Sequence, residues 1–425
     1  MKNVLDVLAE RGFIEQLTDE KAIRESLLRP TTCYIGFDPT APSLHVGSLV
    51  PIMALAHMQR NGHRPIALAG GGTGLVGDPS GKIEMRKVLT KGEIEKNLRA
   101  MGKQFSQFLD FSKGNALLLN NADWLTRLNY IEFLRDIGVH FSVNRMLSFE
   151  SIKVGLERGL SFIEFNYQLL QAYDFWHLFK HFDCVLQMGG SDQWGNIVAG
   201  IDLIRRLQGK AAHGITFPLI ETADGKKMGK TEQGSIWLDA SMTSPYEYYQ
   251  YWVNTDDRDV ERFLSFFTFL PMGEIRSVRS LENADLNMAK HVLAFEATRI
   301  NHGMEEAQCA WKSSVALFGG VNIPAHLFPS SNIPRGDSAE VTEVIPTTII
   351  DRERLERGIV AFEIFKETGL CRSGAEARRL IQQGGAYIDG KGVECFDEPL
   401  KMEYFEKGEI ILRAGKKRFH RVRVR

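Results

Sequence analysis

The chain has 425 residues, of which 44% are hydrophobic and 25% are charged, and its formal net charge is −1. This length allows two or three domains, and the balanced charge excludes a uniformly basic nucleic-acid-binding surface, so such a contact requires a local patch. The five cysteines are scattered and form no CxxC pair, which argues against a disulfide framework and a zinc site. Because we find neither a signal peptide nor an apolar run of about 18 residues, we expect a cytoplasmic protein without membrane contact.

Short apolar runs alternate with helical patterns between residue 31 and about residue 220. The runs typical of buried strands are 31–37, 64–70, 115–120, 184–189 and 214–220. The helical patterns between them are 47–62, 93–109 and 161–180. This alternation predicts an α/β fold with a doubly wound, Rossmann-like parallel sheet, in which a ligand lies beyond the carboxyl ends of the strands.

The remainder of the chain changes character twice. Helical signals dominate from about residue 245 to 320, and little periodicity follows up to residue 355. Two short helical patterns and two strand patterns then predict a compact α+β unit. We therefore predict four segments, namely a catalytic domain 1–235, an α-helical domain 236–320, a linker 321–355 and a small module 356–425.

The stretch FDPTAPSLHVGSL, residues 37–49, places a histidine where a strand ends and a helix begins. The N-terminus of a helix binds anions through free N–H groups, and His45 could donate a further hydrogen bond to a phosphate. Gly47 would let a ligand approach the backbone, since glycine has no Cβ. Taken alone, a surface or capping histidine is the simpler interpretation.

The stretch ALAGGGTGLVGDPSGK, residues 67–82, contains the spacing GxGxxG. It does not fit a dinucleotide-binding fingerprint, because Asp78 and Pro79 interrupt the loop before any helix and the preceding strand is the second of the series. A phosphate-binding P-loop is also excluded, since Val76 and Ile83 occupy positions that the motif reserves for other residues. We interpret the stretch as a glycine-rich loop close to a ligand, with Asp78 and Lys82 as candidate contacts.

Three polar residues share one face of the helix predicted over 161–180. Tyr167, Gln171 and Asp174 follow the spacing i, i+4 and i+7 in an otherwise apolar helix. Such a stripe requires either a buried hydrogen-bond network or a ligand. Asp192 and Gln193 follow the next predicted strand, at the end where a ribose could bind.

A lysine cluster lies in DGKKMGKTEQG, residues 224–234, between glycines. Lysines in such a loop suit a transient polyanion such as a leaving pyrophosphate. A solvated run of charges is the simpler alternative.

Together these motifs resemble a known family. HVGS at 45–48 and KMGKT at 227–231 resemble the HIGH and KMSKS signatures of class I aminoacyl-tRNA synthetases. YIGFDPTAPSLHVGSL, FIEFNYQLLQAYDF and LQMGGSDQWGN are similar to bacterial tyrosyl-tRNA synthetases, and the resemblance extends over essentially the whole chain. It implies an enzyme that activates L-tyrosine with ATP and transfers it to the 3' end of tRNA(Tyr). It also implies Mg²⁺ with the ATP, no tightly bound metal, and a homodimer formed around residues 133–147.

The resemblance assigns a role to each matching residue. The residues implied in catalysis are Thr40, His45, Lys82, Arg86, Lys227, Lys230 and Thr231. Those implied in tyrosine binding are Tyr34, Asp78, Tyr167, Gln171, Asp174 and Gln193. Those implied in ATP binding are Gly36, Asp38, His45, Gly47, Ser48, Gly190, Asp192 and Lys230. Ser48 replaces the final histidine of the HIGH signature, so the nucleotide contact at this position is an open question.

The C-terminal module resembles the RNA-binding module named after ribosomal protein S-four. Residues 411–425 carry seven basic side chains and no acidic one, which suits contacts with phosphates. The expected RNA-binding residues are Arg372, Arg378, Arg379, Lys416, Lys417, Arg418 and Arg421. The alternatives are a tryptophanyl enzyme, an RNA-binding factor on a catalytically dead synthetase body, and an NAD oxidoreductase.

Overall fold

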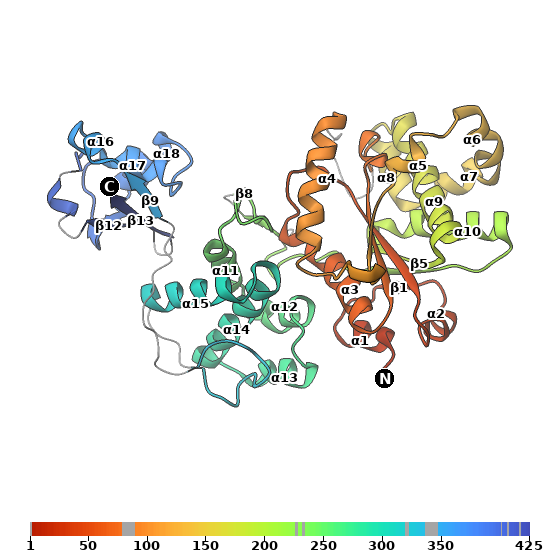
Figure 1. Ribbon diagram of the computed structural model, residues 1–425, viewed down its shortest axis with the longest axis horizontal. Helices are drawn as coiled ribbons and strands as arrows, with labels where there is room; N and C mark the ends of the chain where they lie inside the picture. Colours follow the sequence, from red (N-terminus) through yellow and green to blue (C-terminus); the bar gives the residue numbers. More distant parts are fainter. Residues whose placement is uncertain are drawn as a thin grey trace. The chain divides into compact units, whose positions relative to one another are not determined.

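The computed structural model describes residues 2–78, 90–225, 228–231, 234–318, 323–335, 347–400, 402–405, 408–415 and 418–425. The chain divides into two compact units, residues 1–304 with 323–335 and residues 305–322 with 336–425 (Figure 1). Within the described ranges, no helix is both long enough and apolar enough to span a bilayer.

A six-stranded sheet in the order β1-β6-β5-β2-β3-β4 forms the centre of the first unit. The parallel strands are β2 (Thr32–Phe37), β3 (Arg64–Ala69), β4 (Leu117–Asn120), β5 (Cys184–Gly190) and β6 (His213–Phe217). The strand β1 (Gln16–Leu17) pairs antiparallel with β6 and was not predicted, because two residues carry no periodicity. The five predicted strands and the doubly wound fold are confirmed, with an antiparallel strand added at one edge.

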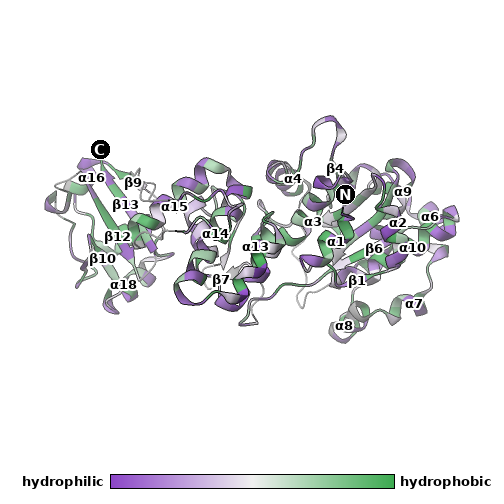
Figure 2. Cartoon of the chain, turned by 90° about the horizontal axis from the view of Figure 1, so that it is seen from below, coloured by the Kyte–Doolittle hydropathy of each residue, from purple (hydrophilic) through white to green (hydrophobic). Residues whose placement is uncertain are grey.

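Helices connect the strands as the sequence pattern predicts. They are α3 (Leu49–Arg60), α4 (Lys91–Phe105), α9 (Phe162–Phe182) and α10 (Trp194–Gln208). The helix α9 begins at a capping box, in which Ser161 and Glu164 satisfy each other's backbone N–H groups. Phe175 and Leu178 of α9 pack against Tyr34 and Ile66 of the sheet in a buried cluster. The strands accordingly appear mainly in the hydrophobic colour of Figure 2.

The order of the strands reverses between β2 and β5. The chain runs from β2 through β3 to β4 on one side and then returns to place β5 on the other side of β2. The register between these two parallel strands ends at Tyr34 and Gln187, although β2 continues to Phe37 and β5 to Gly190. The carboxyl ends of β2 and β5 therefore form the switch point at which doubly wound sheets bind ligands.

Several short helices complete the first unit. Before α9 lie α1 (Val4–Glu10), α2 (Glu20–Ser26), α5 (Ala122–Leu125), α6 (Tyr130–Asp136), α7 (Val143–Ser148) and α8 (Glu150–Arg158). After the sheet lie α11 (Pro245–Val253), α12 (Val260–Phe267), α13 (Met272–Arg276) and α14 (Asn283–His302). The helix α11 begins with Ser244 and Glu247 in a capping box and Pro245 in its first turn, a strong start signal. The helical character predicted for this region is confirmed.

The second unit contains most of α15 (Met304–Phe318) and a five-stranded sheet in the order β11-β10-β12-β13-β9. The strands are β9 (Thr347–Ile350), β10 (Ala386–Ile388), β11 (Lys391–Gly392), β12 (Glu409–Ala414) and β13 (Arg418–Val424). The helices α16 (Arg352–Glu356), α17 (Ala361–Glu367) and α18 (Gly374–Gln382) accompany them. Ile350 and Leu355 join the buried core of this unit, so the last part of the expected linker packs with the module.

Candidate active site

The two signature segments lie side by side at the carboxyl end of β2. The backbone N–H of Val46 donates to Ile236 at 3.0 Å, and the N–H of Ile236 donates to Gly229 at 3.1 Å. A Cβ built on Gly229 would lie 2.7 Å from Val46 Cγ2, and the positive φ of +80° also favours glycine here. Gly229 therefore permits the close approach of the KMGKT segment to the HVGS segment.

His45 caps the short turn that leads into α3. Its Nδ1 accepts a hydrogen bond of 3.0 Å from the backbone N–H of Gly47. A Cβ on Gly47 would lie 2.6 Å from His45 Cε1 and 3.2 Å from the carbonyl oxygen of Met228. The capping interpretation is thus confirmed, and the cap fixes the imidazole beside the second signature.

Near the carboxyl end of β2, at the switch point, one residue of the strand is exposed. Gly36 is exposed although its neighbours in the strand are buried, and a Cβ built on it would meet nothing within 4 Å. Gly70 of the glycine-rich loop could not carry a side chain, because its Cβ would lie 2.7 Å from Asp38 Oδ1. Asp38 and Thr40 lie just after β2 in the chain, and Thr40 is exposed. Among the described residues, no side chain therefore covers the backbone of β2 at Gly36.

A buried polar pair lies between β2 and α9. Tyr34 is 1% exposed, and its hydroxyl makes no hydrogen bond within the described residues. Asp174 is 3% exposed and accepts hydrogen bonds from Asn121 Nδ2 at 2.8 Å and Trp124 Nε1 at 2.7 Å. Burial raises the pKa of Asp174 to about 7, and burial and the Asp174 charge raise the pKa of Tyr34 well above its usual range.

Asn121, which the sequence analysis did not identify, connects this pair to the glycine-rich loop. Its Oδ1 accepts from the backbone N–H of Gly72 at 2.7 Å, and its Nδ2 also donates to Thr73 Oγ1 at 3.0 Å. One amide thus binds the loop and Asp174 together. A signal was available, because NNAD directly follows a predicted strand at the edge where ligands bind.

A second polar network joins the remaining predicted tyrosine residues. Gln193 Nε2 donates to Asp78 Oδ2 at 2.9 Å, and Asn196 Nδ2 donates to Gln193 Oε1 at 3.1 Å. Asn196 also donates to Gln171 Oε1 at 3.0 Å, while Tyr167 is buried one turn earlier on α9. The structure therefore brings together residues from the glycine-rich loop, α9 and the end of β5. Asn196 is a further member that the sequence analysis missed.

The structure describes the surroundings of some of the remaining predicted residues, and the others lie outside the described ranges. Gly190 approaches Asp192 closely, since a Cβ there would lie 2.4 Å from Asp192 Oδ1. Lys230 and Thr231 form β7 (Lys230–Thr231), which pairs with β8 (Gly234–Ser235). The predicted residues outside the described ranges are Lys82, Arg86, Lys227, Lys416 and Lys417. Among the described residues, no group of three or more His, Cys, Asp or Glu could hold a metal ion.

The basic side chains of the second unit differ in exposure. Arg372, Arg378 and Arg379 are exposed at the start of and along α18, where Arg378 lies 3.8 Å from the centre of the Phe362 ring. Arg418 is half-buried and donates to the carbonyl oxygen of Leu370. The Arg421 side chain is 2% exposed, and its Nε lies 3.6 Å from Glu409 Oε1. Arg421 is thus buried within the second unit and is not exposed for contact with phosphates.

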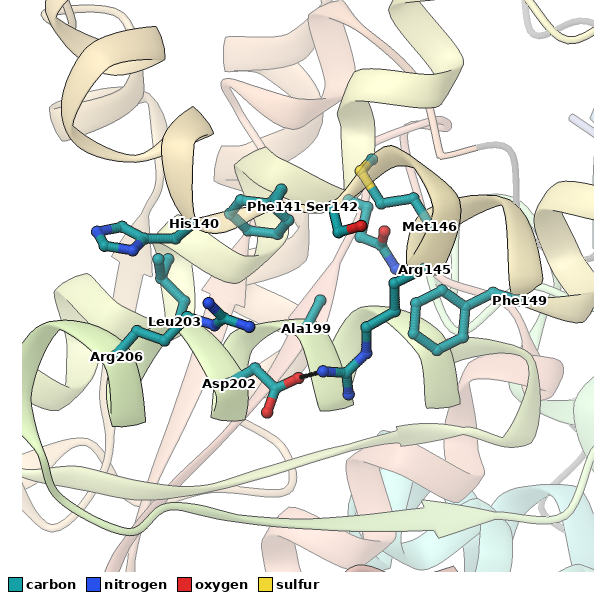
Figure 3. A pocket seen from close by; sticks show the side chains of 11 residues that line it. His140, Phe141, Ser142, Arg145, Met146, Phe149, Ala199, Asp202, Leu203 and Arg206 are labelled. Atoms are coloured by element: carbon teal, nitrogen blue, oxygen red, sulfur yellow. Dashed lines mark ion pairs between the residues drawn. The ribbon is translucent and has the colours of Figure 1, made fainter.

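A separate pocket is lined by side chains of α10 and of the segment 140–149 (Figure 3). His140, Arg145 and Met146 line it from the short turn η4 (Gly138–His140) and from α7, and an ion pair joins Arg145 to Asp202 of α10. None of the described residues that were predicted to act in catalysis, tyrosine binding or nucleotide binding lines this pocket. Its lining residues His140, Arg145 and Met146 belong to residues 133–147, around which the resemblance implies a subunit contact.

Comparisons with known proteins identify the family of the chain. The family model described as tRNA synthetases class I (W and Y) matches residues 26–319. Tyrosine--tRNA ligase of Syntrophus aciditrophicus is 59% identical over 425 residues, covering 100% of this chain and 99% of its own. Tyrosine--tRNA ligase of Desulfosudis oleivorans is 59% identical with the same coverage. A solved C-terminally truncated mitochondrial tyrosyl-tRNA synthetase of Aspergillus nidulans is 34% identical with a TM-score of 0.67, covering 75% of this chain and 95% of that one.

Proposed function

Because the chain belongs to the class I tRNA synthetases of the W and Y group, we propose that it is a tyrosine–tRNA ligase that forms tyrosyl-adenylate and charges tRNA(Tyr). ATP is the co-substrate of this class. Relatives that are 59% identical over the full length and carry the name Tyrosine--tRNA ligase support this function.

The observation that carries the choice of amino acid is the buried pair formed by Tyr34 and Asp174. Among the described residues the Tyr34 hydroxyl has no hydrogen-bond partner, and Asp174 is an acceptor beside it. A phenol can accept from one group and donate to the other, whereas the indole N–H of tryptophan only donates and phenylalanine does neither. Tyrosine is therefore the amino acid that satisfies both groups.

The reaction consists of two displacements. A carboxylate oxygen of tyrosine attacks the α-phosphorus of ATP, and the bond to the pyrophosphate leaving group breaks. The terminal ribose hydroxyl of the tRNA then attacks the acyl carbon, AMP leaves, and the hydroxyl proton is released. No protein nucleophile is required, so the protein contributes positioning and charge stabilisation. Mg²⁺ is expected to accompany ATP, bound mainly by phosphate oxygens.

Residues near the two signatures would stabilise the charge that develops on phosphate. We assign Thr40, His45 and Lys230 to the phosphates, and Gly36, Asp38 and Asp192 to the nucleoside. The contact between the signature segments supports this assignment, because it brings residues that are nearly 200 positions apart to one end of β2. Lys82, Arg86, Lys227 and Thr231 are proposed to bind the pyrophosphate, and Gly47, Ser48 and Gly190 to line the nucleotide. Asp78, Tyr167, Gln171 and Gln193 would hold the amino-acid backbone of tyrosine.

The second unit is proposed to bind tRNA. Arg372, Arg378 and Arg379 are exposed around α18 and suit contacts with phosphates. The burial of Arg421 removes it from this set. Binding of tRNA(Tyr) with and without substitution of these three arginines by alanine, measured across salt concentrations, tests the assignment. Unchanged affinity and salt dependence would contradict it.

A cytoplasmic homodimer is the proposed assembly. Several large apolar side chains of the first unit are exposed between residues 130 and 163, including Ile131, Val139 and Phe162, which is 72% exposed. Exposed apolar side chains that gather in one segment are typical of subunit interfaces. Sedimentation equilibrium should give twice the chain mass, and a monomer at micromolar concentration would contradict the proposal.

The exchange of pyrophosphate into ATP tests the function directly. The purified protein should exchange labelled pyrophosphate in the presence of tyrosine and much more slowly with tryptophan or phenylalanine. Exchange that depends on tryptophan would favour the tryptophanyl alternative. Binding of tRNA without any exchange would favour an RNA-binding factor on an inactive body.

A further inference from the structure

The chain on both flanks of Lys227, the first residue of the KMGKT segment, is bound by the helical region that follows this segment in the chain. This region comprises α11, the short turn η6 (Asp257–Asp259) and α12, and it lies within the first unit. The contacts involve the described residues on either side of Lys227, namely 221–224 and 228–229.

Asp259 binds the first flank. Its side chain is buried, Oδ2 accepts a hydrogen bond of 2.7 Å from the backbone N–H of Ala223, and Oδ1 accepts from Arg262 at 2.6 Å. Arg262 also donates to the carbonyl oxygen of Glu221. A buried carboxylate that binds a loop N–H and an arginine at once holds the loop backbone in one place.

Tyr251 binds the second flank. Its hydroxyl is hydrogen-bonded to the backbone of Gly229, the residue that packs against Val46 and the N–H of Gly47. Met228 is buried, and its N–H donates to Ile220 at 3.3 Å. A continuous set of contacts thus leads from α11 through Gly229 to the HVGS turn that His45 caps.

We propose that Tyr251 and Asp259 are positioning residues, through which the helical region sets the place of the KMGKT segment against the HVGS turn. The inference rests on the proposed function, because the segment matters only if it serves ATP. It predicts that losing either contact weakens the handling of ATP and leaves tyrosine binding unchanged, since neither residue contacts the Tyr34–Asp174 pair.

The test uses the Tyr251→Phe variant and a matched control, Tyr249→Phe. Both residues lie on α11, and each substitution removes one hydroxyl, but the Tyr249 hydroxyl is bonded to His291 Nδ1 at 2.9 Å on α14. In tyrosine-dependent pyrophosphate exchange, Tyr251→Phe should lower kcat/KM for ATP by about 2- to 12-fold, the range expected for one net hydrogen bond. Its KM for tyrosine should equal that of the wild type. Tyr249→Phe should change the thermal unfolding midpoint but neither kinetic parameter.

Asp259→Ala provides a second, independent variant. In the full-length protein it should also lower kcat/KM for ATP. Equal losses for ATP in Tyr251→Phe and Tyr249→Phe would assign the effect to general destabilisation and overturn the inference. So would wild-type ATP kinetics in both Tyr251→Phe and Asp259→Ala. A wild-type protein without tyrosine-dependent exchange would instead overturn the proposed function, and the inference with it.

Discussion

The hydroxyl of Tyr34 should contribute to the discrimination between tyrosine and phenylalanine. Tyr34→Phe keeps the buried ring, which packs against Phe175 with centroids 5.4 Å apart, and removes one partner of the substrate phenol. The ratio of kcat/KM for tyrosine over phenylalanine in pyrophosphate exchange should fall by an amount equivalent to about 0.5–1.5 kcal/mol.

Tyr246→Phe is the matched control for this substitution. Tyr246 is also buried, and its hydroxyl also lacks a hydrogen-bond partner among the described residues, but it lies on α11. The control should leave the ratio unchanged. If Tyr34→Phe also leaves it unchanged, Tyr34 does not contact the phenol.

The raised pKa of Asp174 predicts a pH-dependent loss of stability. Its pKa is about 7 in the folded protein and 3.8 as the ordinary value of an unfolded chain, with burial as the main cause. Between these pH values the folded protein retains a proton that the unfolded chain has released, so the free energy of unfolding falls as the pH rises. The total effect is of order a few kcal/mol. Urea unfolding of wild type and Asp174→Asn from pH 4 to pH 7 measures it, and the variant should lack this decline. Parallel pH profiles would contradict the prediction.

The sequence predicted which side chains of α9 belong to the candidate site, but not which groups form hydrogen bonds with them. The i, i+4, i+7 spacing identified Tyr167, Gln171 and Asp174 because periodicity is a local property. Asn121 and Asn196 were missed, because their bonds to Gly72, Thr73 and Gln171 join positions 25 to 49 residues apart, which no single-sequence pattern pairs. The choice between a buried network and a ligand site also required coordinates, and the structure shows the hydrogen-bond network.

At the scale of elements, long and strongly patterned segments were predictable and short ones were not. The five parallel strands carry continuous apolar runs, and α9 has a capping box and five turns of consistent pattern. The helices α5 to α8 have four to nine residues each and lack such a signal, so they were not predicted. Their place between β4 and α9 explains the exposed apolar segment there.

At the scale of the whole molecule, the second unit should be separable from adenylate formation. The core of residues 350–422 contains no residue of the first unit, and all predicted adenylate contacts precede residue 235. A chain that ends at Arg335 should retain pyrophosphate exchange within about twofold and lose most tRNA charging, because binding to tRNA phosphates is lost. The relatives solved as C-terminally truncated proteins make such a chain practicable.

The position of the cut is part of this prediction. A chain that ends at residue 355 would keep β9 without its partner β13 and expose Ile350. It should therefore aggregate more readily than the chain that ends at Arg335, as light scattering would record. Equal losses of exchange and charging in the shorter chain would show that the two units do not function separately.

The open space beside Gly36 has a genetic consequence. Its Cβ would meet no atom of the described residues within 4 Å, so Gly36→Ala adds a methyl group only where the nucleotide is expected to lie. Such a chain would fold, escape proteolytic quality control and, in the proposed homodimer, still pair with wild-type subunits. In a cell that carries both alleles, it would accumulate as an inactive partner and still sequester tRNA. A single methyl group could thus produce a dominant growth defect where a destabilising mutation would be recessive.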